Sequence, residues 1–348
     1  MRFEGRRLLR RGLALLAYGY TITLGLVLFA LYWCGERWWV TTALLYVPRI
    51  AFAIPLPLIV LGLIFSGNRR LLWTQLVALA IVLFPLMGFV LPWPSPAPPA
   101  GRSLRLLSFN VDSAFFGVPR VVEQITQALP DVALIQEGQF NGGELRERLR
   151  GFYPYVEASN QFTIASRFRI LETTEQPMLP YYGRQRHGRF MRYLLDTPLG
   201  QLAFYSVHPI SPRGALHVHR FRDALHLLRT GALLAGDPEA DLGSNTGLRA
   251  LQIAAVAEAS LRERVPVVIA GDTNLPGLSL IFRNNLSRYA DAFQVASSGF
   301  GYSFPAKQPF LRLDRILSGP ELRFTSFRVG CQGVSDHLCV VAEIERQR

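Results

Sequence analysis

An uncharged apolar run from Leu13 to Trp33 limits the folds that are open to this chain. About 20 consecutive apolar residues are enough for a helix to cross a bilayer. Five arginines precede the run, and a cleaved signal peptide would also combine a basic start with an apolar stretch. However, no small-x-small cleavage site follows Ala30, and further apolar segments come next. The sequence therefore favours a retained membrane helix and excludes a single soluble globule.

Two more apolar runs follow, from Ile50 to Phe65 and from Leu71 to Val90, with the pair Arg69-Arg70 between them. Prolines break the middle run, which a helix in a membrane bundle tolerates. Basic residues mark the cytoplasmic side of a membrane protein. Two crossings separate the N-terminal arginines from Arg69-Arg70, so both groups can lie inside. A middle run that only dips into the bilayer would instead place the following domain in the cytoplasm.

We expect three crossings and hence a multi-pass cell-membrane protein that contacts the lipid bilayer through residues 13–91. Everything after Trp93 then lies on the extracytoplasmic, periplasmic side. We predict a membrane region over residues 1–93, a proline-rich linker over 94–103 and a catalytic domain over 104–348. Proline-rich linkers are stiff and extended, so this one would hold the domain about 30 Å from the bilayer.

The charge is distributed unevenly between these parts. The chain has a net charge of +12, of which residues 1–100, with nine Arg and two Glu, supply +7. A remainder of +5 is modest for a nucleic-acid-binding domain. Two arginine-rich stretches, 184–192 and 213–222, could still meet an anionic substrate, or could be ordinary surface in a chain with a single lysine.

Beyond the linker, short aliphatic runs alternate with helical patterns, which predicts a mixed sheet with helices outside, in the α/β or α+β class. The predicted helices are 118–129, 214–234, 248–264 and 278–295. The predicted strands are 104–110, 132–136, 162–166, 190–196, 202–208, 267–270, 313–317, 322–329 and 339–344.

Polar residues recur where these strands end, which is where α/β proteins usually place their sites. Each of them alone has an ordinary structural explanation as a turn former or a solvated strand end. Together they provide four acids, two amides and two histidines, an inventory that suits a hard divalent cation and a phosphate group. The candidates are Asn110, Glu137, His208, Asp272, Asn274, Asp314, Asp336 and His337.

The strings LRLLSFNVD, VALIQEGQ, AFYSVHPISP, VVIAGDTNLP, LRLDRILSG and GVSDHLCVVAEI, in this order, resemble the endonuclease/exonuclease/phosphatase superfamily. The resemblance covers Leu104 to about Ile344, and GDTN followed by SDH is its most specific part. It implies a four-layer sandwich in which two mixed β-sheets pack face to face between layers of helices. It also implies a metal-dependent hydrolase that acts on phosphoric esters.

The resemblance implies a role for each candidate residue. Glu137 would be the principal ligand of Mg²⁺, with Mn²⁺ as a substitute, and Asn110 and Asp336 would join the metal shell. His337 would take the proton from the attacking water, and Asp314 would orient its imidazole. Asp272 would position that water or help to deprotonate it. Asn274 and His208 would donate hydrogen bonds to the phosphate oxygens, His208 more strongly when protonated.

The substrate stays open at this level, beyond being an anionic, phosphate-containing molecule. A nuclease-like phosphodiesterase is slightly favoured over a phospholipid or sphingolipid headgroup phosphodiesterase or phosphatase. A non-catalytic binding module on the same fold predicts missing site residues, and none is missing. No feature of the sequence predicts a protein partner. Cys331 and Cys339 flank Ser335-Asp336-His337, and although an oxidising compartment could join them, we expect two unpaired thiols.

Overall fold

A computed structural model describes residues 2–91, 101–213 and 242–347 of the chain. These residues divide into two compact units, which are described separately. One consists of residues 1–90 with the short segment Gly277–Leu280, and the other of residues 91–276 and 281–348. The predicted linker falls largely on residues 92–100, outside the described residues, as does the predicted helix 214–234.

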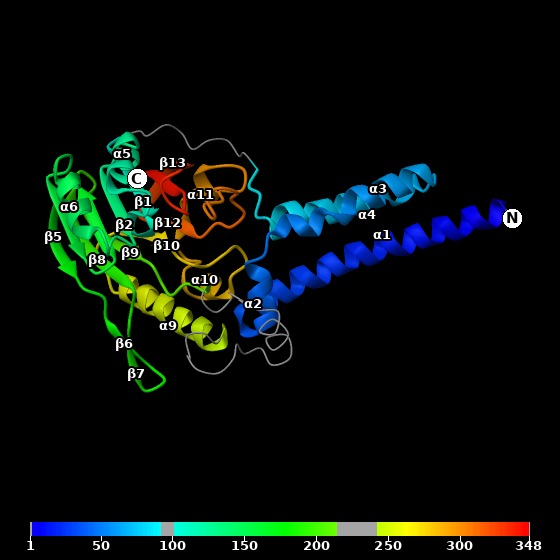
Figure 1. Ribbon diagram of the computed structural model, residues 1–348, viewed down its shortest axis with the longest axis horizontal. Helices are drawn as coiled ribbons and strands as arrows, with labels where there is room; N and C mark the ends of the chain where they lie inside the picture. Colours follow the sequence, from blue (N-terminus) through cyan, green and yellow to red (C-terminus); the bar gives the residue numbers. More distant parts are fainter. Residues whose placement is uncertain (1, 92–100, 214–241, 348) are drawn as a thin grey trace. The chain divides into compact units, whose positions relative to one another are not determined.

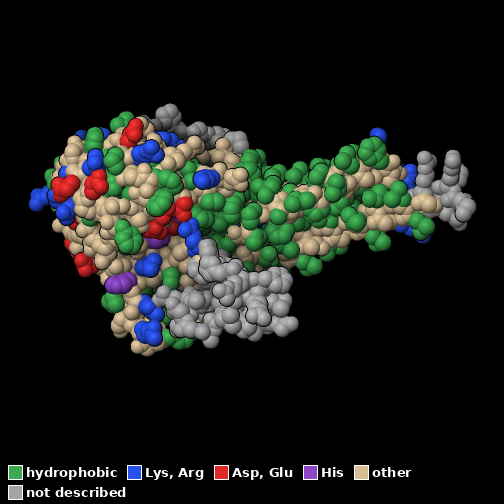
Figure 2. All heavy atoms as spheres, in the orientation of Figure 1, with side chains coloured by type: hydrophobic (Ala, Val, Ile, Leu, Met, Phe, Trp, Pro, Cys, Tyr) green, Lys and Arg blue, Asp and Glu red, His purple; other side chains and the backbone are tan. Residues whose placement is uncertain are grey.

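The N-terminal unit is helical and has an apolar surface. Leu15, Leu26 and Phe29 on its first helix are each at least 60% exposed, and hydrophobic side chains cover these helices in Figure 2. Water does not favour a contiguous apolar surface of this kind, whereas a bilayer core does. The helices are α1 (Arg2–Trp33), α2 (Trp39–Leu45), α3 (Pro55–Phe65) and α4 (Leu72–Ile81), and a π-helical turn over Val82–Leu86 extends α4 (Figure 1).

Hydrogen bonds establish the relative directions of these helices. Near the start of α1, Arg10 Nε donates to Ser66 O at the end of α3 (2.7 Å), and Asn68 Nδ2 donates to Arg10 O (3.2 Å). Farther along α1, the Tyr20 hydroxyl donates to the carbonyl of Phe52, ahead of α3. At the same level Thr21 Oγ1 reaches Thr74 O in α4 (3.2 Å). Consequently α3 runs antiparallel to α1, and α4 runs parallel to it.

Two helical stretches are long and apolar enough to cross a membrane, Arg7–Trp33 and Arg69–Leu86. A third span is possible only if Trp39–Leu45 and Arg49–Phe65, which are bent by 93° relative to each other, count as one. The described helices therefore provide two to three candidate spans where the sequence predicts three. Helix α3 alone, with 11 residues, is about 17 Å long, shorter than the bilayer core of about 30 Å.

The second unit contains two six-stranded sheets (Figure 1). In spatial order the first sheet is β13 (Leu322–Gly330), β14 (Cys339–Arg346), β1 (Ser103–Asn110), β2 (Val132–Gln136), β4 (Phe162–Ser166) and β3 (Tyr155–Ser159). The second is β11 (Ala290–Asp291), β12 (Asp314–Ser318), β10 (Val267–Asp272), β9 (Gly200–Val207), β8 (Phe190–Thr197) and β5 (Arg169–Thr174). A separate hairpin consists of β6 (Met178–Tyr181) and β7 (Arg184–His187).

Each sheet is mixed, because β1 pairs parallel with β2, and β9 with β10, while all other pairs are antiparallel. The alternation of side chains along a strand explains the layers. Leu107 and Phe109 of β1 pack with α5 (Val118–Gln127) and α6 (Gly142–Arg150). The intervening Ser108 points instead to the other sheet, as does Gln136 of β2, whose Nε2 donates to Ser206 Oγ of β9 (3.0 Å).

Helices α9 (Leu242–Leu261) and α10 (Leu280–Asn285) cover the second sheet, where Ile253 and Val256 pack against Ile269 of β10. The order of layers is therefore helix, sheet, sheet, helix, and the predicted four-layer sandwich is confirmed. One predicted helix is wrong. Residues 278–295 form α10, the short strand β11 and α11 (Ala292–Ala296), because Asp291 pairs with Leu317 in the sheet and then caps α11.

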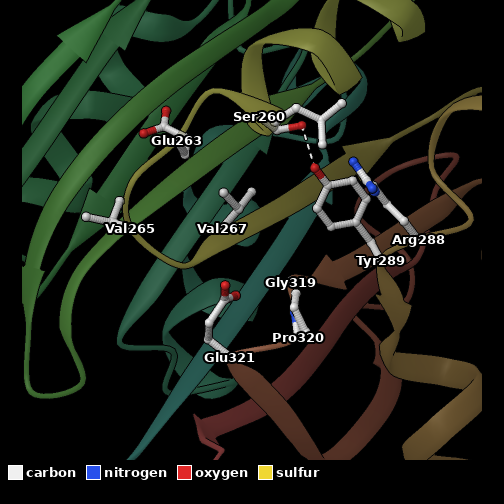
Figure 3. A pocket seen from close by; sticks show the side chains of 10 residues that line it. Ser260, Glu263, Val265, Val267, Arg288, Tyr289, Gly319, Pro320 and Glu321 are labelled. Atoms are coloured by element: carbon white, nitrogen blue, oxygen red, sulfur yellow. Dashed lines mark hydrogen bonds between the residues drawn. The ribbon is translucent and has the colours of Figure 1, made fainter.

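A pocket of about 330 Å³ lies at the end of the second sheet where β10 begins. Val265 and Val267 line it, together with Tyr289, whose hydroxyl bonds to Ser260 Oγ (2.7 Å; Figure 3). The polar strand ends singled out in the sequence lie at the opposite end of β10, where Asp272 terminates the strand. This pocket is therefore separate from the candidate site.

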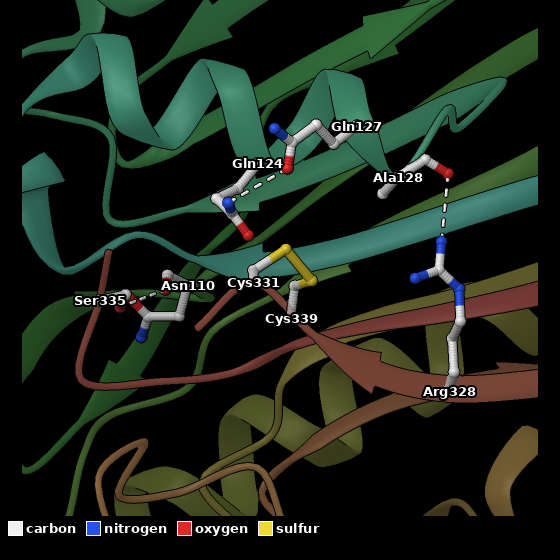
Figure 4. The surroundings of a disulfide bond; sticks show 8 residues. All are labelled: Asn110, Gln124, Gln127, Ala128, Arg328, Cys331, Ser335 and Cys339. Atoms are coloured by element: carbon white, nitrogen blue, oxygen red, sulfur yellow. Dashed lines mark hydrogen bonds between the residues drawn. A yellow bond between two sulfur atoms is a disulfide. The ribbon is translucent and has the colours of Figure 1, made fainter. Parts of the chain in front are cut away.

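The prediction of two unpaired thiols at Cys331 and Cys339 is wrong, because the two residues form a disulfide (Figure 4). The register between β13 and β14 pairs Gly330 with Cys339. Cys331 follows Gly330 directly, so its Cα comes within 5.3 Å of that of Cys339, a spacing that suits a disulfide. The sequence could not reveal this, because it does not establish the register of the two strands. The bond closes the loop that carries Asp336 and His337.

This disulfide should be detectable in the full-length protein. Denatured without reductant and then alkylated, the chain should take up one alkyl group, at Cys34, and Cys34→Ser should take up none. Cys331→Ser should lower the unfolding temperature by roughly 5 °C, because closing a loop of about nine residues is worth about 2–3 kcal/mol. Alkylation at all three cysteines would contradict the bond.

Candidate active site

The polar strand ends of both sheets meet at one edge of the sandwich. Asn110 ends β1 and Glu137 follows β2, its parallel neighbour. In the other sheet, His208 follows β9 and Asp272 ends β10, again a parallel pair. Parallel neighbours end at the same edge of a sheet, and the sheets are stacked, so the four ends converge. The antiparallel register of β10 with β12 adds Asp314 directly opposite Asp272.

Asp272 lies at the centre of this arrangement and is 2% exposed. Its Oδ2 accepts a hydrogen bond from Asn110 Nδ2 (3.2 Å), and Nε2 of His208 and of His337 each lie 3.6 Å from the same oxygen. Asn110 Nδ2 also donates to Glu137 Oε1 (2.9 Å), which is 3.3 Å from His208 Nε2. One buried carboxylate thus connects residues from four separate segments of the chain.

His337 forms a buried pair with Asp314. The Nδ1 atom of His337 lies 2.8 Å from Asp314 Oδ2, and the Phe304 ring packs on the imidazole with centroids 4.6 Å apart. Burial disfavours a charged imidazole, but the carboxylates of Asp314 and Asp272 outweigh it and raise the pKa of His337 to about 10. Because Nδ1 is engaged with Asp314, Nε2 is the atom directed toward the site.

His208 is held differently. Its Nδ1 lies 2.6 Å from Gln161 Oε1, in the turn between β3 and β4. Burial lowers the pKa of His208 to about 4, against the opposing effect of Asp272. The lowered pKa favours a neutral ring at neutral pH, and the stronger donation of a protonated His208 to a phosphate stays a prediction.

The remaining two candidates lie beside this group. The backbone N–H of Asn274 donates to Asp272 Oδ1 (2.9 Å), and its side-chain amide donates to Pro209 O (3.1 Å). Asp336 pairs with Arg213, whose Nη2 is 2.7 Å from Asp336 Oδ2. The guanidinium of Arg213 also lies over the ring of Phe304, 5.1 Å from its centroid. All eight predicted residues therefore belong to one constellation.

Sequence reasoning missed three supporting residues. Gln161 orients His208. Ser335 Oγ donates to Asn110 O (2.8 Å) and accepts from His337 N (3.1 Å), which ties the His337 loop to β1 (Figure 4). Ser303 Oγ accepts from Asp314 N (3.2 Å). The serine two residues before His337 was a usable signal, because such a hydroxyl commonly bonds the backbone N–H two residues on. Gln161 had no local signal.

The site carries more negative than positive charge. The carboxylates of Glu137, Asp272, Asp314 and Asp336 face the guanidinium of Arg213 and the imidazole of His337. Burial raises the pKa of Glu137 against the hydrogen bond from Asn110, and nearby Asp272 raises it further. Such crowding of acids is relieved by a divalent cation, so this donor set fits a metal ion.

The described residues contain one buried group of acids and histidine that could hold a metal ion, Asp272, Asp314 and His337. One ligand atom from each lies within 4.8 Å of the others. This group shares no residue with the predicted ligand set of Glu137, Asn110 and Asp336, although Asn110 Nδ2 donates to Asp272 Oδ2 (3.2 Å). In addition, Asp314 Oδ1 has no hydrogen-bond partner among the described residues. Among the described residues, the geometry thus offers a possible cation site at Asp272, Asp314 and His337.

Comparisons with known proteins agree with this architecture. A structure from Bacteroides thetaiotaomicron, an endonuclease/exonuclease/phosphatase family protein, matches with a TM-score of 0.51 and 17% identity, covering 71% of this chain and 99% of that one. Zebrafish (D. rerio) TDP2, solved with a single-strand DNA product, matches with 0.50 and 17%, covering 70% and 100%. A beta toxin structure from Staphylococcus aureus matches with 0.50 and 16%, covering 69% and 99%.

At these identities the structural matches establish the fold alone. The sequence matches no curated protein. The family comparison is more specific, because the model of the Endonuclease/Exonuclease/phosphatase family matches residues 107–337, which is well over half of the chain. That range begins within β1, ahead of Asn110, and ends at His337, so it spans the whole constellation. The chain therefore belongs to the Endonuclease/Exonuclease/phosphatase family, whose members hydrolyse phosphoester bonds.

Proposed function

We propose that this protein is a membrane-anchored, Mg²⁺-dependent phosphodiester hydrolase. The observation that supports it best is the convergence of Glu137, Asp272 and the Asp314–His337 pair at one edge of the sandwich. A non-catalytic module would not need a buried, oriented histidine beside several carboxylates. Because α2 and α3 are sharply bent relative to each other and α3 is short, three membrane crossings are part of this proposal.

In this proposal Glu137 is the principal ligand of the metal, and Asn110 and Asp336 complete its shell. Carboxylate and amide oxygens are the ligands that Mg²⁺ prefers. When bound, the ion would polarise a phosphoryl oxygen and offset the negative charge of the surrounding carboxylates. The Arg213–Asp336 ion pair shows that Asp336 already faces a cation, and a metal would compete with Arg213 for this carboxylate.

The residues of the chain would handle the proton and orient the phosphate. A cation bound beside the ring would disfavour the charge on the imidazole, so that neutral His337 could accept the proton of the attacking water at Nε2. Asp314 would hold the ring in the orientation that this requires. Asp272, 3.6 Å from that nitrogen, would position the water. The new P–O bond forms as the ester P–O bond breaks, and the departing oxygen takes a proton from solvent. His208 and the side-chain amide of Asn274 would donate to the non-bridging oxygens.

The substrate class is the finer part of the proposal. The arginine-rich stretches that suggested nuclease-like activity give it limited support. Arg192 is committed to ion pairs with Glu263 and Glu172, and the second stretch beyond Arg213 lies outside the described residues. TDP2 and the beta toxin share the fold with this chain, but the fold does not select between a nucleic-acid and a lipid substrate.

The first test is a hydrolysis assay with the full-length protein in detergent. Diester substrates would include DNA, RNA, sphingomyelin, phosphoinositides and bis(p-nitrophenyl) phosphate, each with Mg²⁺ or with EDTA. His337→Ala and Glu137→Gln should each lower the rate at least about 100-fold on any accepted substrate. The exposed residues His187 and Glu147 supply matched controls, His187→Ala and Glu147→Gln, which should keep the wild-type rate. Near-normal turnover of both site variants would refute the proposal.

A second test locates the metal. Glu137→Gln should raise the Mg²⁺ concentration for half-maximal activity at least about tenfold, because it removes the charged ligand. Asp314→Asn should lower the maximal rate and leave that concentration unchanged, because Asp314 acts on the ring of His337. If Asp314→Asn shifts the metal requirement more than Glu137→Gln does, the ion lies in the Asp272–Asp314–His337 group instead.

A third test concerns orientation in the membrane. Because α1 and α4 run parallel and Arg10 lies beside the α3–α4 turn, both basic clusters lie at one end of the helical unit, which supports a cytoplasmic position for them. In a Cys34→Ser background, a membrane-impermeant maleimide should label Asn160→Cys in intact cells. Arg70→Cys should be labelled only after permeabilisation. The reverse pattern would place the catalytic domain in the cytoplasm.

A further inference from the structure

Three exposed phenylalanines lie on the two loops that leave the site from the first sheet. Phe115 is 81% exposed, Phe116 41% and Phe140 79%. Phe115 and Phe116 follow Asn110 by five and six residues, and Phe140 follows Glu137 by three. The rings of Phe115 and Phe116 pack edge to face, 5.5 Å apart. We call these three residues the aromatic rim. Exposing three large aromatic side chains so close together is costly in water.

The two loops are held to each other and to the site. Ser113 N donates to Glu137 O (3.0 Å), and Asn141 Nδ2 donates to Ser113 O (2.7 Å). Asn110 Oδ1 accepts from Asp112 N (3.1 Å), so the side chain proposed as a metal ligand also orders the start of the first loop. The loops that carry the aromatic rim are therefore hydrogen-bonded to each other and to the candidate site.

The near absence of charged residues on these loops favours an apolar partner for the aromatic rim over a nucleic acid. Residues 111–117 and 138–143 contain a single charged side chain, Asp112. Aromatic platforms that stack nucleic-acid bases are combined with cationic grooves that follow the phosphate backbone. The described rim loops have no cation, so they suit an apolar partner with one phosphate, which the site itself would receive.

We propose that the aromatic rim contacts the apolar part of a phospholipid in the bilayer while the headgroup phosphodiester occupies the site. This inference rests on the proposed function and names its substrate class. The same chain carries helices that are long and apolar enough to cross a membrane, Arg7–Trp33 and Arg69–Leu86. Aromatic side chains are favoured at the interface between lipid and water, so the aromatic rim suits that interface.

The experiment compares soluble and lipid diesters in one detergent. Full-length protein would be assayed on bis(p-nitrophenyl) phosphate, on single-stranded DNA and on mixed micelles of phospholipids with choline, ethanolamine, glycerol or inositol headgroups, and of sphingomyelin. The double variant Phe115→Ser/Phe140→Ser should lower kcat/KM for the accepted phospholipid at least about tenfold, because the apolar area that the two phenylalanines would bury against the lipid is removed. Its rate on bis(p-nitrophenyl) phosphate should change less than about twofold. Phe152→Ser, at the far end of α6 and 62% exposed in the wild type, should alter neither.

The possible failures are distinguishable. If the wild type hydrolyses none of the diesters, the proposed function fails. If it hydrolyses bis(p-nitrophenyl) phosphate or DNA but no phospholipid, the proposed function stands and the aromatic rim proposal is overturned. Equal loss on both diesters in the double variant, or loss on single-stranded DNA alone, would also overturn it, the latter in favour of base stacking.

Discussion

The carboxylate of Asp272 connects the two sheets at the edge where their polar strand ends meet. It accepts a hydrogen bond from Asn110 of the first sheet and lies 3.6 Å from the imidazoles of His208 and His337. A buried carboxylate is costly unless it is paired. Its distant partners come from three separate parts of the chain, so this carboxylate keeps its partners only when both sheets are packed as in the native fold.

At the same edge of the sandwich, several carboxylates lie close together and shift the pKa values of their neighbours. Burial and neighbouring acids raise the pKa of Glu137, and two carboxylates hold the proton on His337. Groups with such shifts are concentrated at functional sites. The disulfide between Cys331 and Cys339 and the hydrogen bonds of Ser335 fasten the His337 loop. The loop is therefore fixed by a covalent bond and by hydrogen bonds where the charges are most crowded.

The helical unit and the catalytic unit each expose apolar side chains, on the helices of the first and on the aromatic rim of the second. On the helices this surface suits a bilayer core, and on the aromatic rim it suits the boundary between lipid and water. Neither surface is satisfied by the residues that the structure describes around it. The proposed membrane-anchored phosphoesterase would give both surfaces a partner, and the proposed lipid substrate would then follow from the membrane location.

Much of this protein was determined locally by its sequence. Apolar runs in the sequence specify the helix α1 and the strands β2 and β4. The predicted limits of β2 and β4 agree with the structure to the residue. The polar residues that follow the strands are part of the same pattern. Tertiary structure decided the pairings. Arg213 with Asp336, Gln161 with His208 and Cys331 with Cys339 depend on sheet register and on loops from distant segments. Residues 278–295 were predicted as one helix with a polar face, whereas the pairing of β11 with β12 divides them. The local sequence pattern predicts which face of a helix or strand is buried, but only tertiary packing determines which distant residues contact each other there.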